Sequence, residues 1–173
     1  MHETGLVRNQ WIRGIALVVV TTAMLGSTAA VAETVTDHDR HPRKTAEEVC
    51  ESMVRDSVIA AAGRKLARPR TGVWNGNTYT CTYDFGAQGS IVVTVEVMAD
   101  HAAARKEFAT RRAAAPKRVT LFGMGQAAFR SGQTQIVARK DRFLLTVDGS
   151  ALTRAVHPSA TTWSTTRAVF DCW

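Results

Sequence analysis

TYTCTYDFGAQGSIVVTVEVM, residues 78–98, contains two segments in which apolar and polar side chains alternate. The apolar positions are Tyr79, Cys81, Tyr83 and Phe85 in the first segment, and Ile91, Val93, Val95 and Val97 in the second. Alternation with a period of two places the apolar side chains on one face of a β-strand. The glycine-containing stretch 86–89 between the segments is typical of a turn. We therefore predict an antiparallel β-hairpin with one buried face.

The segment before this hairpin has the pattern of an amphipathic helix. Thr45 and Glu48 have the spacing of a capping box, which opens a helix. Apolar residues then recur at helical spacing: Ala46, Val49, Cys50, Met53, Val54, Val58, Ala61 and Ala62. Gly63 is suited to the position after the last helical residue. We expect a helix from residue 45 to 62 with Cys50 on its buried side, and a tight turn at Asn75-Gly76 before the hairpin.

The segment after the hairpin predicts a second helix, short strands and a third helix. Asp100 is a favoured N-cap for a helix over 102–115, which buries Ala104 and Phe108. Short strands are expected at 119–122, 127–130, 135–139 and 143–147. A last helix is expected from Pro158, which suits a first helical position, because Ala160, Trp163, Arg167 and Phe170 have helical spacing, although four threonines disfavour it. Strands joined by tight turns pair antiparallel, so we predict an α+β fold: an antiparallel sheet or sheets of short strands packed by two or three helices.

The first 32 residues resemble an export signal. Arg8 and Arg13 precede an apolar run of 11 residues, Ile15 to Leu25, and the small-residue stretch Ala30-Val31-Ala32 follows. A membrane-spanning helix needs about 20 residues. We expect cleavage between Ala32 and Glu33, with an uncleaved anchor as the alternative. The prediction is a signal peptide at 1–32, a disordered polar leader at 33–44 and a single domain at 45–173.

The charge of the chain favours anionic surroundings. The formal net charge is +7, and removal of residues 1–32 lowers it by only one. Two clusters carry much of it: Arg64, Lys65, Arg68 and Arg70 after the first helix, and Arg105, Lys106, Arg111 and Arg112 on the second. If both clusters share a surface, that basic face fits an anionic envelope polymer, a membrane surface or an acidic protein. A solvated surface that serves solubility is the alternative. Nucleic acid is not expected as a partner of an exported protein, nor is an integral membrane location.

No motif in the sequence indicates a reaction, a cofactor or a metal. His101 lies next to Asp100, but adjacent helical residues do not face one another. His157 precedes a proline and is expected in a loop, and Cys172 has no histidine near it in sequence. Two hypotheses remain: a secreted, non-catalytic envelope protein that binds an anionic or protein partner, and an exported hydrolase-type enzyme whose site assembles from dispersed residues.

The order of several short motifs resembles a family. These motifs are Glu48-Val49-Cys50, the strand 79–83, the Ala104/Phe108 helix, the segment 119–129, the strand 143–147 and the closing Cys172-Trp173. In this order they resemble small exported, often lipid-anchored, envelope proteins of unknown function from high-GC Gram-positive bacteria. The resemblance implies export and implies no activity. No cysteine closely follows the apolar run, so lipid attachment is not expected here.

The three cysteines allow three pairings, and an oxidising compartment permits a disulfide. The resemblance implies a bond between the helix cysteine and the strand cysteine, Cys50–Cys81, which leaves Cys172 over. The apolar side of the predicted helix and the aromatic face of the predicted strand also favour this pair. Cys50–Cys172 is the rival pairing.

Overall fold

The computed structural model describes residues 40–68 and 72–173, which belong to one compact unit of the chain. The predicted signal peptide, its cleavage site at Ala32 and Glu33, and the leader as far as residue 39 lie outside the described residues. The basic residue Arg70 also lies outside them.

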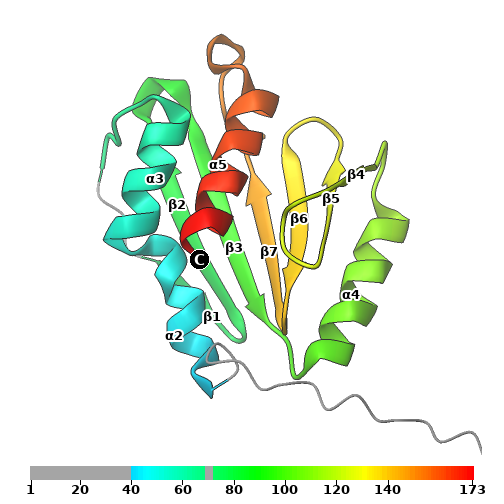
Figure 1. Cartoon of the computed structure of the whole chain (residues 1–173). Helices are drawn as coiled ribbons and strands as arrows, with labels where there is room; N and C mark the ends of the chain where they lie inside the picture. The colour runs from blue at the N-terminus through cyan, green and yellow to red at the C-terminus, as the bar shows by residue number, and fades with distance from the viewer. Residues whose placement is uncertain (1–39, 69–71) are drawn as a thin grey trace, which may run out of the picture. The chain divides into compact units, whose positions relative to one another are not determined.

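One antiparallel sheet of seven strands forms the centre of the fold (Figure 1). In spatial order its strands are β1 (Val73–Asn75), β2 (Thr78–Asp84), β3 (Ser90–Val97), β7 (Phe143–Asp148), β6 (Gln135–Lys140), β5 (Ala127–Ser131) and β4 (Val119–Leu121). The predicted hairpin is confirmed as β2–β3, in which Cys81 lies opposite Val93. The predicted turn at Asn75-Gly76 is confirmed as the connection from β1 to β2. Pairing of β3 with β7 joins these strands to the later ones.

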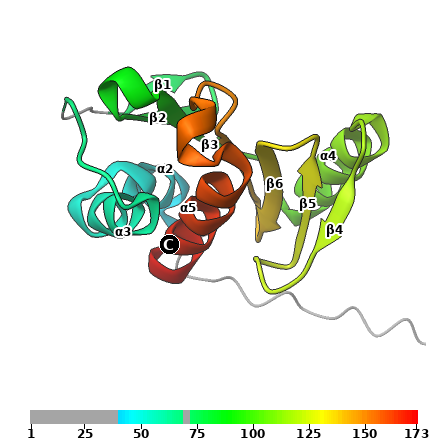
Figure 2. The ribbon, with the colours of Figure 1, turned by 90° about the horizontal axis from the view of Figure 1, so that it is seen from above.

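The helices are divided between the two faces of the sheet. They are α2 (Pro42–Glu47), α3 (Ser52–Ala62), α4 (His101–Ala114) and α5 (Pro158–Cys172), with short 3₁₀ segments η1 (Glu48–Cys50), η2 (Gly86–Gln88) and η3 (Arg154–Val156). Figure 2 shows α2, α3 and α5 on one side of the sheet, here called the α5 face, and α4 on the other, here called the α4 face. The predicted α+β class, a sheet of short strands packed by helices, is confirmed.

The first helical region differs from the prediction. Helix α2 starts at Pro42, so residues 42–44 of the predicted disordered leader are helical and Thr45 is buried inside the helix rather than capping it. Proline is favourable at this first position because it has no N–H to leave unpaired. The extended backbone of Glu51 (ψ 166°) then separates η1 from α3. This break leaves Met53 65% exposed, outside the buried stripe predicted for it. Gly63 ends α3 in the left-handed conformation, as expected.

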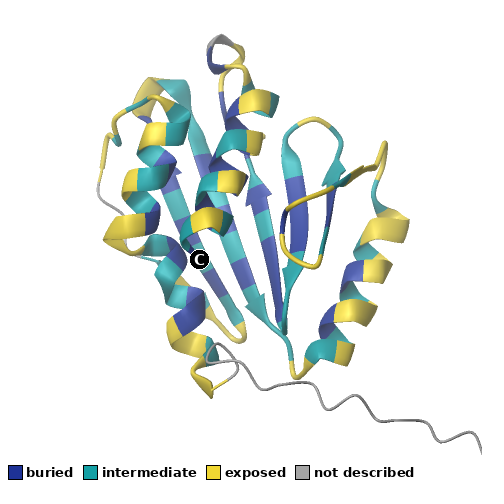
Figure 3. Cartoon of the chain, viewed as in Figure 1, coloured by how far each residue is buried: buried dark blue, intermediate teal, exposed yellow. Residues whose placement is uncertain are grey.

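The main core lies on the α5 face. Along β2 and β3 buried residues alternate with half-buried ones, and Figure 3 shows the same alternation along the strands. On the α5 face the apolar residues of β2, β3 and β7 pack against α2, α3 and α5. A smaller cluster on the α4 face joins Phe108 to Phe129, Val137 and Leu144. Asp100 caps α4 by accepting a hydrogen bond from Ala103 N at 2.7 Å, as predicted.

The disulfide Cys50–Cys81 ties η1 to β2 and confirms the predicted pair. Cys172 is the remaining thiol, half-buried, with its Sγ 3.1 Å from Ser57 Oγ. The rival bond to Cys172 is therefore not formed.

The predicted last helix is confirmed as α5, and its threonines face the core. Its buried residues are Thr161, Thr162, Thr165, Thr166 and Val169, whereas Ala160, Trp163 and Arg167, whose spacing predicted the helix, are exposed. The physical reason is that two of these threonine hydroxyls, those of Thr162 and Thr166, find partners in the helix itself. Thr162 Oγ1 donates to Pro158 O at 2.7 Å, and Thr166 Oγ1 donates to Thr162 O at 2.7 Å. Such bonds satisfy the hydroxyls and let the methyl groups pack in the core.

Candidate functional site

The structure does not bring the two predicted basic clusters together. Arg64, Lys65 and Arg68 follow α3, which lies on the α5 face (Figure 2). Arg105, Lys106, Arg111 and Arg112 lie on α4, on the opposite side of the sheet. The prediction of one continuous basic face from these residues is therefore wrong. The hydrophobic pattern located both helices, but it did not indicate that they cover opposite faces.

A first pocket, here called the cationic pocket, lies between the β5–β6 turn and the start of α5. Its volume is about 790 Å³. It lies on the α5 face, because Arg130 stands opposite Ile136, which packs against α5. Its lining residues are Arg130, Gln133, Thr134, Arg154, His157, Pro158, Ser159, Ala160 and Trp163. None of them is acidic.

Three side chains that carry or can carry positive charge converge on this pocket. Arg130 comes from β5, and its Nη1 lies 3.4 Å from Ser159 Oγ at the start of α5. The Arg130 Nε is buried and has no hydrogen-bond partner in the described part of the chain. Arg154 comes from η3, and His157 lies between η3 and α5 with a positive φ of 50°. Positive φ is uncommon in residues other than glycine.

The start of α5 adds a further positive field to the cationic pocket. This end of the helix has no capping side chain and no acidic residue in its first turn. The free N–H groups there carry the positive end of the helix dipole, which attracts anions and repels cations. Cationic side chains at this end are unfavourable by themselves, and a bound anion would neutralise both sources of charge.

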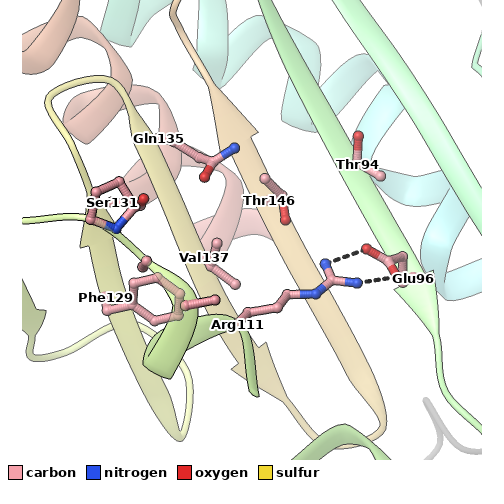
Figure 4. Close-up of a pocket in the computed structure, with 11 residues that line it drawn as sticks. Thr94, Glu96, Arg111, Phe129, Ser131, Gln135, Val137 and Thr146 are labelled. Atoms are coloured by element: carbon pink, nitrogen blue, oxygen red, sulfur yellow. Dashed lines mark hydrogen bonds and ion pairs between the residues drawn. The ribbon is translucent and has the colours of Figure 1, made fainter. Parts of the chain in front are cut away.

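A second pocket, here called the hydroxyl pocket, lies on the α4 face and has a volume of about 440 Å³. It is bounded by β3, β7, β6 and β5 below and by the end of α4 above (Figure 4). Its lining residues are Thr94, Glu96, Arg111, Ala114, Ala115, Pro116, Phe129, Ser131, Gln135, Val137 and Thr146.

An ion pair forms one wall of the hydroxyl pocket. Arg111 donates from both terminal nitrogens to the two carboxylate oxygens of Glu96, at 2.5 and 2.7 Å (Figure 4). Its Nε donates to Glu107 Oε1 at 2.8 Å. The hydrogen bond to Glu96 raises the pKa of Arg111, with a smaller contribution from the bond to Glu107, so the guanidinium stays charged. Arg111, predicted as part of a free basic face, is therefore neutralised by two carboxylates.

The floor of the hydroxyl pocket is apolar and its sides are polar. Phe129 and Val137 form the floor, and the Phe129 ring packs edge-on against Phe108 with 5.3 Å between centroids. The remaining polar side chains are Thr94, Ser131, Gln135 and Thr146, all half-buried. None of these four has a side-chain hydrogen bond to another residue that the structure describes.

Neither pocket contains a recognisable catalytic group. Glu96 is the one carboxylate in the two linings, and Arg111 occupies it. His101 lines neither pocket, and no hydrogen bond joins His157 to Ser159 in the described residues. Within residues 40–68 and 72–173 there is no group of three or more metal-ligating side chains. In the same ranges no helix has both the length and the apolar character needed to cross a bilayer.

Sequence reasoning did not identify the three basic residues of the cationic pocket as site residues. Arg130, Arg154 and His157 are scattered along the sequence and have no common motif. A signal was nevertheless present: His157 and Arg154 directly precede a helix that starts at Pro158. Basic residues are disfavoured before a helix N-terminus, so their position there is an unusual local feature of the sequence.

Comparison with models of protein families, with curated proteins and with solved structures finds no match to this chain.

Proposed function

We propose that this chain is an exported, non-catalytic binding protein of the cell envelope that holds an anionic group of its ligand, a phosphate or a carboxylate, in the cationic pocket. One observation carries the proposal. Arg130, Arg154 and His157 converge on an uncapped helix N-terminus, and no carboxylate lines the pocket.

The chemistry of the lining fits an oxyanion. A guanidinium presents several N–H donors in a planar fork that matches the oxygens of phosphate and carboxylate. Arg130 and Arg154 both line the pocket and supply such donors. The side chain of Trp163, 37% exposed, gives the pocket an aromatic rim for the uncharged part of a ligand. A lysine-rich surface patch would lack this directional set of donors.

The proposal of export has separate support. The Cys50–Cys81 disulfide suits an oxidising compartment, and residues 1–32 have the pattern of a cleaved signal. The resemblance to small exported envelope proteins of high-GC Gram-positive bacteria agrees with this location. An anionic group of an envelope polymer, of a membrane surface or of an acidic protein is then the ligand that the cationic pocket would meet.

The proposal is tested by titrating the protein with inorganic phosphate and with acetate in a calorimeter. We expect saturable binding of at least one of these anions. The double variant Arg130→Gln/Arg154→Gln should bind about tenfold or more weakly, because hydrogen bonds to charged groups contribute about 1.5–3 kcal/mol each. The matched control is Lys106→Gln/Arg112→Gln, which removes the same charge from the exposed side of α4 and should bind like the wild type.

Two results would contradict the proposal. One is the absence of saturable binding of either anion to the wild type. The other is an equal loss of affinity in the two double variants, which would assign the binding to net charge rather than to the cationic pocket.

Export is tested independently by the intact mass of protein recovered from the culture medium of an expressing actinobacterial host. We expect a chain that begins at Glu33. A mass that retains the apolar run Ile15 to Leu25 would show that the segment acts as an anchor.

A further inference from the structure

The α4 face carries a second site whose chemistry differs from that of the cationic pocket. We propose that the hydroxyl pocket binds a neutral, polyhydroxylated ligand, a short segment of a glycan. This inference is independent of the proposed anion site, because the two pockets lie on opposite faces of the sheet and share no lining residue.

The first argument is unused hydrogen-bonding capacity. Thr94, Ser131, Gln135 and Thr146 come from four neighbouring strands and line the same pocket (Figure 4). They provide three hydroxyls and one amide, which can both donate and accept. Half-buried polar groups without protein partners are satisfied by water or by a ligand. A sugar presents paired hydroxyls, which also donate and accept, and so matches this set.

The second argument is charge. Arg111 forms ion pairs with two carboxylates, those of Glu96 and Glu107, so the net charge of this wall is not positive. An anion entering the hydroxyl pocket would meet Glu96 and be repelled. A cation would meet a carboxylate whose two oxygens already accept hydrogen bonds from Arg111. The planar, paired groups of Glu96 and Arg111 suit uncharged hydroxyls at the wall.

The third argument is the shape of the surroundings. The apolar floor of Phe129 and Val137, with Ala115 and Pro116 at the rim, can pack against the C–H faces of a sugar ring. From the pocket, cross-strand register places Thr146, Thr94 and Thr80 in one row across β7, β3 and β2. Neighbouring strands are about 4.8 Å apart. Helix α4 packs against β6 and β7 rather than β2 and β3 (Figure 2), and Thr94 and Thr80 are half-buried, so a chain of sugars can continue from the pocket along this row.

The test uses soluble, neutral trisaccharides: maltotriose, cellotriose and the trisaccharide of N-acetylglucosamine. Each is titrated into the ¹⁵N-labelled protein while amide resonances are followed by NMR. We expect at least one of them to cause saturable shifts centred on the amides of Thr94 and Thr146 and on the side-chain amide of Gln135. The variant Thr94→Val/Thr146→Val removes two hydroxyls with little change in shape and should weaken binding about tenfold.

The matched control is Thr82→Val, which removes a hydroxyl from the same side of β2 outside the pocket lining and should bind like the wild type. Valine is favourable in strands, so these variants should retain the fold, and the dispersion of their NMR spectra verifies this. The inference is overturned if no trisaccharide shifts these resonances up to its solubility limit, or if Thr94→Val/Thr146→Val binds as tightly as the wild type. It is also overturned if phosphate or spermidine binds more tightly at the same resonances, because the hydroxyl pocket would then prefer a charged ligand.

Discussion

The cationic pocket and the hydroxyl pocket differ in how their charges relate to the nearest helix. At the hydroxyl pocket, Arg111 and Arg112 lie in the last turn of α4, where the negative end of the helix dipole favours them, and two carboxylates neutralise Arg111. At the cationic pocket, Arg154 and His157 precede the positive end of α5, and no acidic residue lines the site. The first arrangement is electrostatically complete. The second leaves the positive charge of its lining without a carboxylate, which is the basis of the anion site proposed there.

The same hairpin supplies both pockets. Arg130 of β5 faces α5, whereas its neighbours Phe129 and Ser131 face α4. Successive residues of a strand point to opposite sides of the sheet, so one strand can contribute to two sites of different chemistry. The net charge of a surface region therefore cannot be inferred from charged residues that are close in sequence.

The largest expected effect is on the stability of the whole domain, which supports both pockets. Replacing both bonded cysteines, Cys50→Ala/Cys81→Ala, should lower the free energy of unfolding by about 3–4 kcal/mol, because the disulfide closes a loop with a sequence separation of 31. Urea unfolding of the oxidised wild type and of the variant measures the difference. Below the transition both pockets should still bind their probes. A change below about 1 kcal/mol would show that η1 and β2 are held together without the bond.

The second prediction separates the pockets. Arg111→Gln leaves Glu96, whose side chain is 19% exposed, without its partner. The free energy of unfolding should fall by about 1–3 kcal/mol, since a partly buried charge loses its hydrogen bonds. The phosphate affinity of the cationic pocket should not change. If phosphate affinity fell with stability, the two sites would be coupled through the sheet rather than independent.

The third prediction concerns the salt dependence of ligand affinity at the two pockets. Raising the ionic strength from about 0.1 M to about 1 M shortens the Debye length from about 10 Å to about 3 Å. Phosphate affinity should fall about tenfold, or about 1.4 kcal/mol, whereas trisaccharide affinity should change less than about twofold. Calorimetric titrations at the two concentrations of a chloride salt measure both affinities. Equal salt dependence at the two pockets would contradict the assignment of a charged and a neutral site.

The smallest effect concerns the helix that carries the cationic pocket. Thr165 Oγ1 is buried without a hydrogen-bond partner in the described residues, so Thr165→Val should leave the free energy of unfolding unchanged or raise it by up to about 1 kcal/mol. Thr162→Val is the matched control, because it removes the bond to Pro158 O and should not stabilise the protein. Thermal unfolding distinguishes the two. A clear loss of stability in Thr165→Val would indicate an internal partner for its hydroxyl.

Much of the fold could be predicted because local patterns determine it. The alternation in 78–98, the cap at Asp100 and the glycine at 63 each act within a few residues and gave correct elements. The first helix was misplaced because Pro42 starts it earlier and Glu51 breaks it. The threonines of α5 count against a helix by propensity, yet Thr162 and Thr166 bond back to the helix and so behave as core residues.

The candidate sites were less accessible to sequence reasoning. Two strands far apart in sequence must pair before Thr94 and Thr146 become neighbours, and no local pattern specifies that pairing. The sequence shows that Arg111 is charged, but its partner Glu96 lies on a different element, so the ion pair can be identified only from the structure. The disulfide was predictable because both cysteines lie on faces that hydrophobic periodicity identifies.

The alternation along β6 has a consequence for how such a protein can diverge in evolution. Substitution of Gln135 or Val137 alters only the α4 face, while substitution of Ile136 or Ala138 alters only the other. Insertion or deletion of a single residue within this strand would instead invert every side chain beyond it and disrupt both faces together. Related chains should therefore vary in the identity of these residues while keeping the length of the strand constant, and length changes should be confined to the turn 132–134.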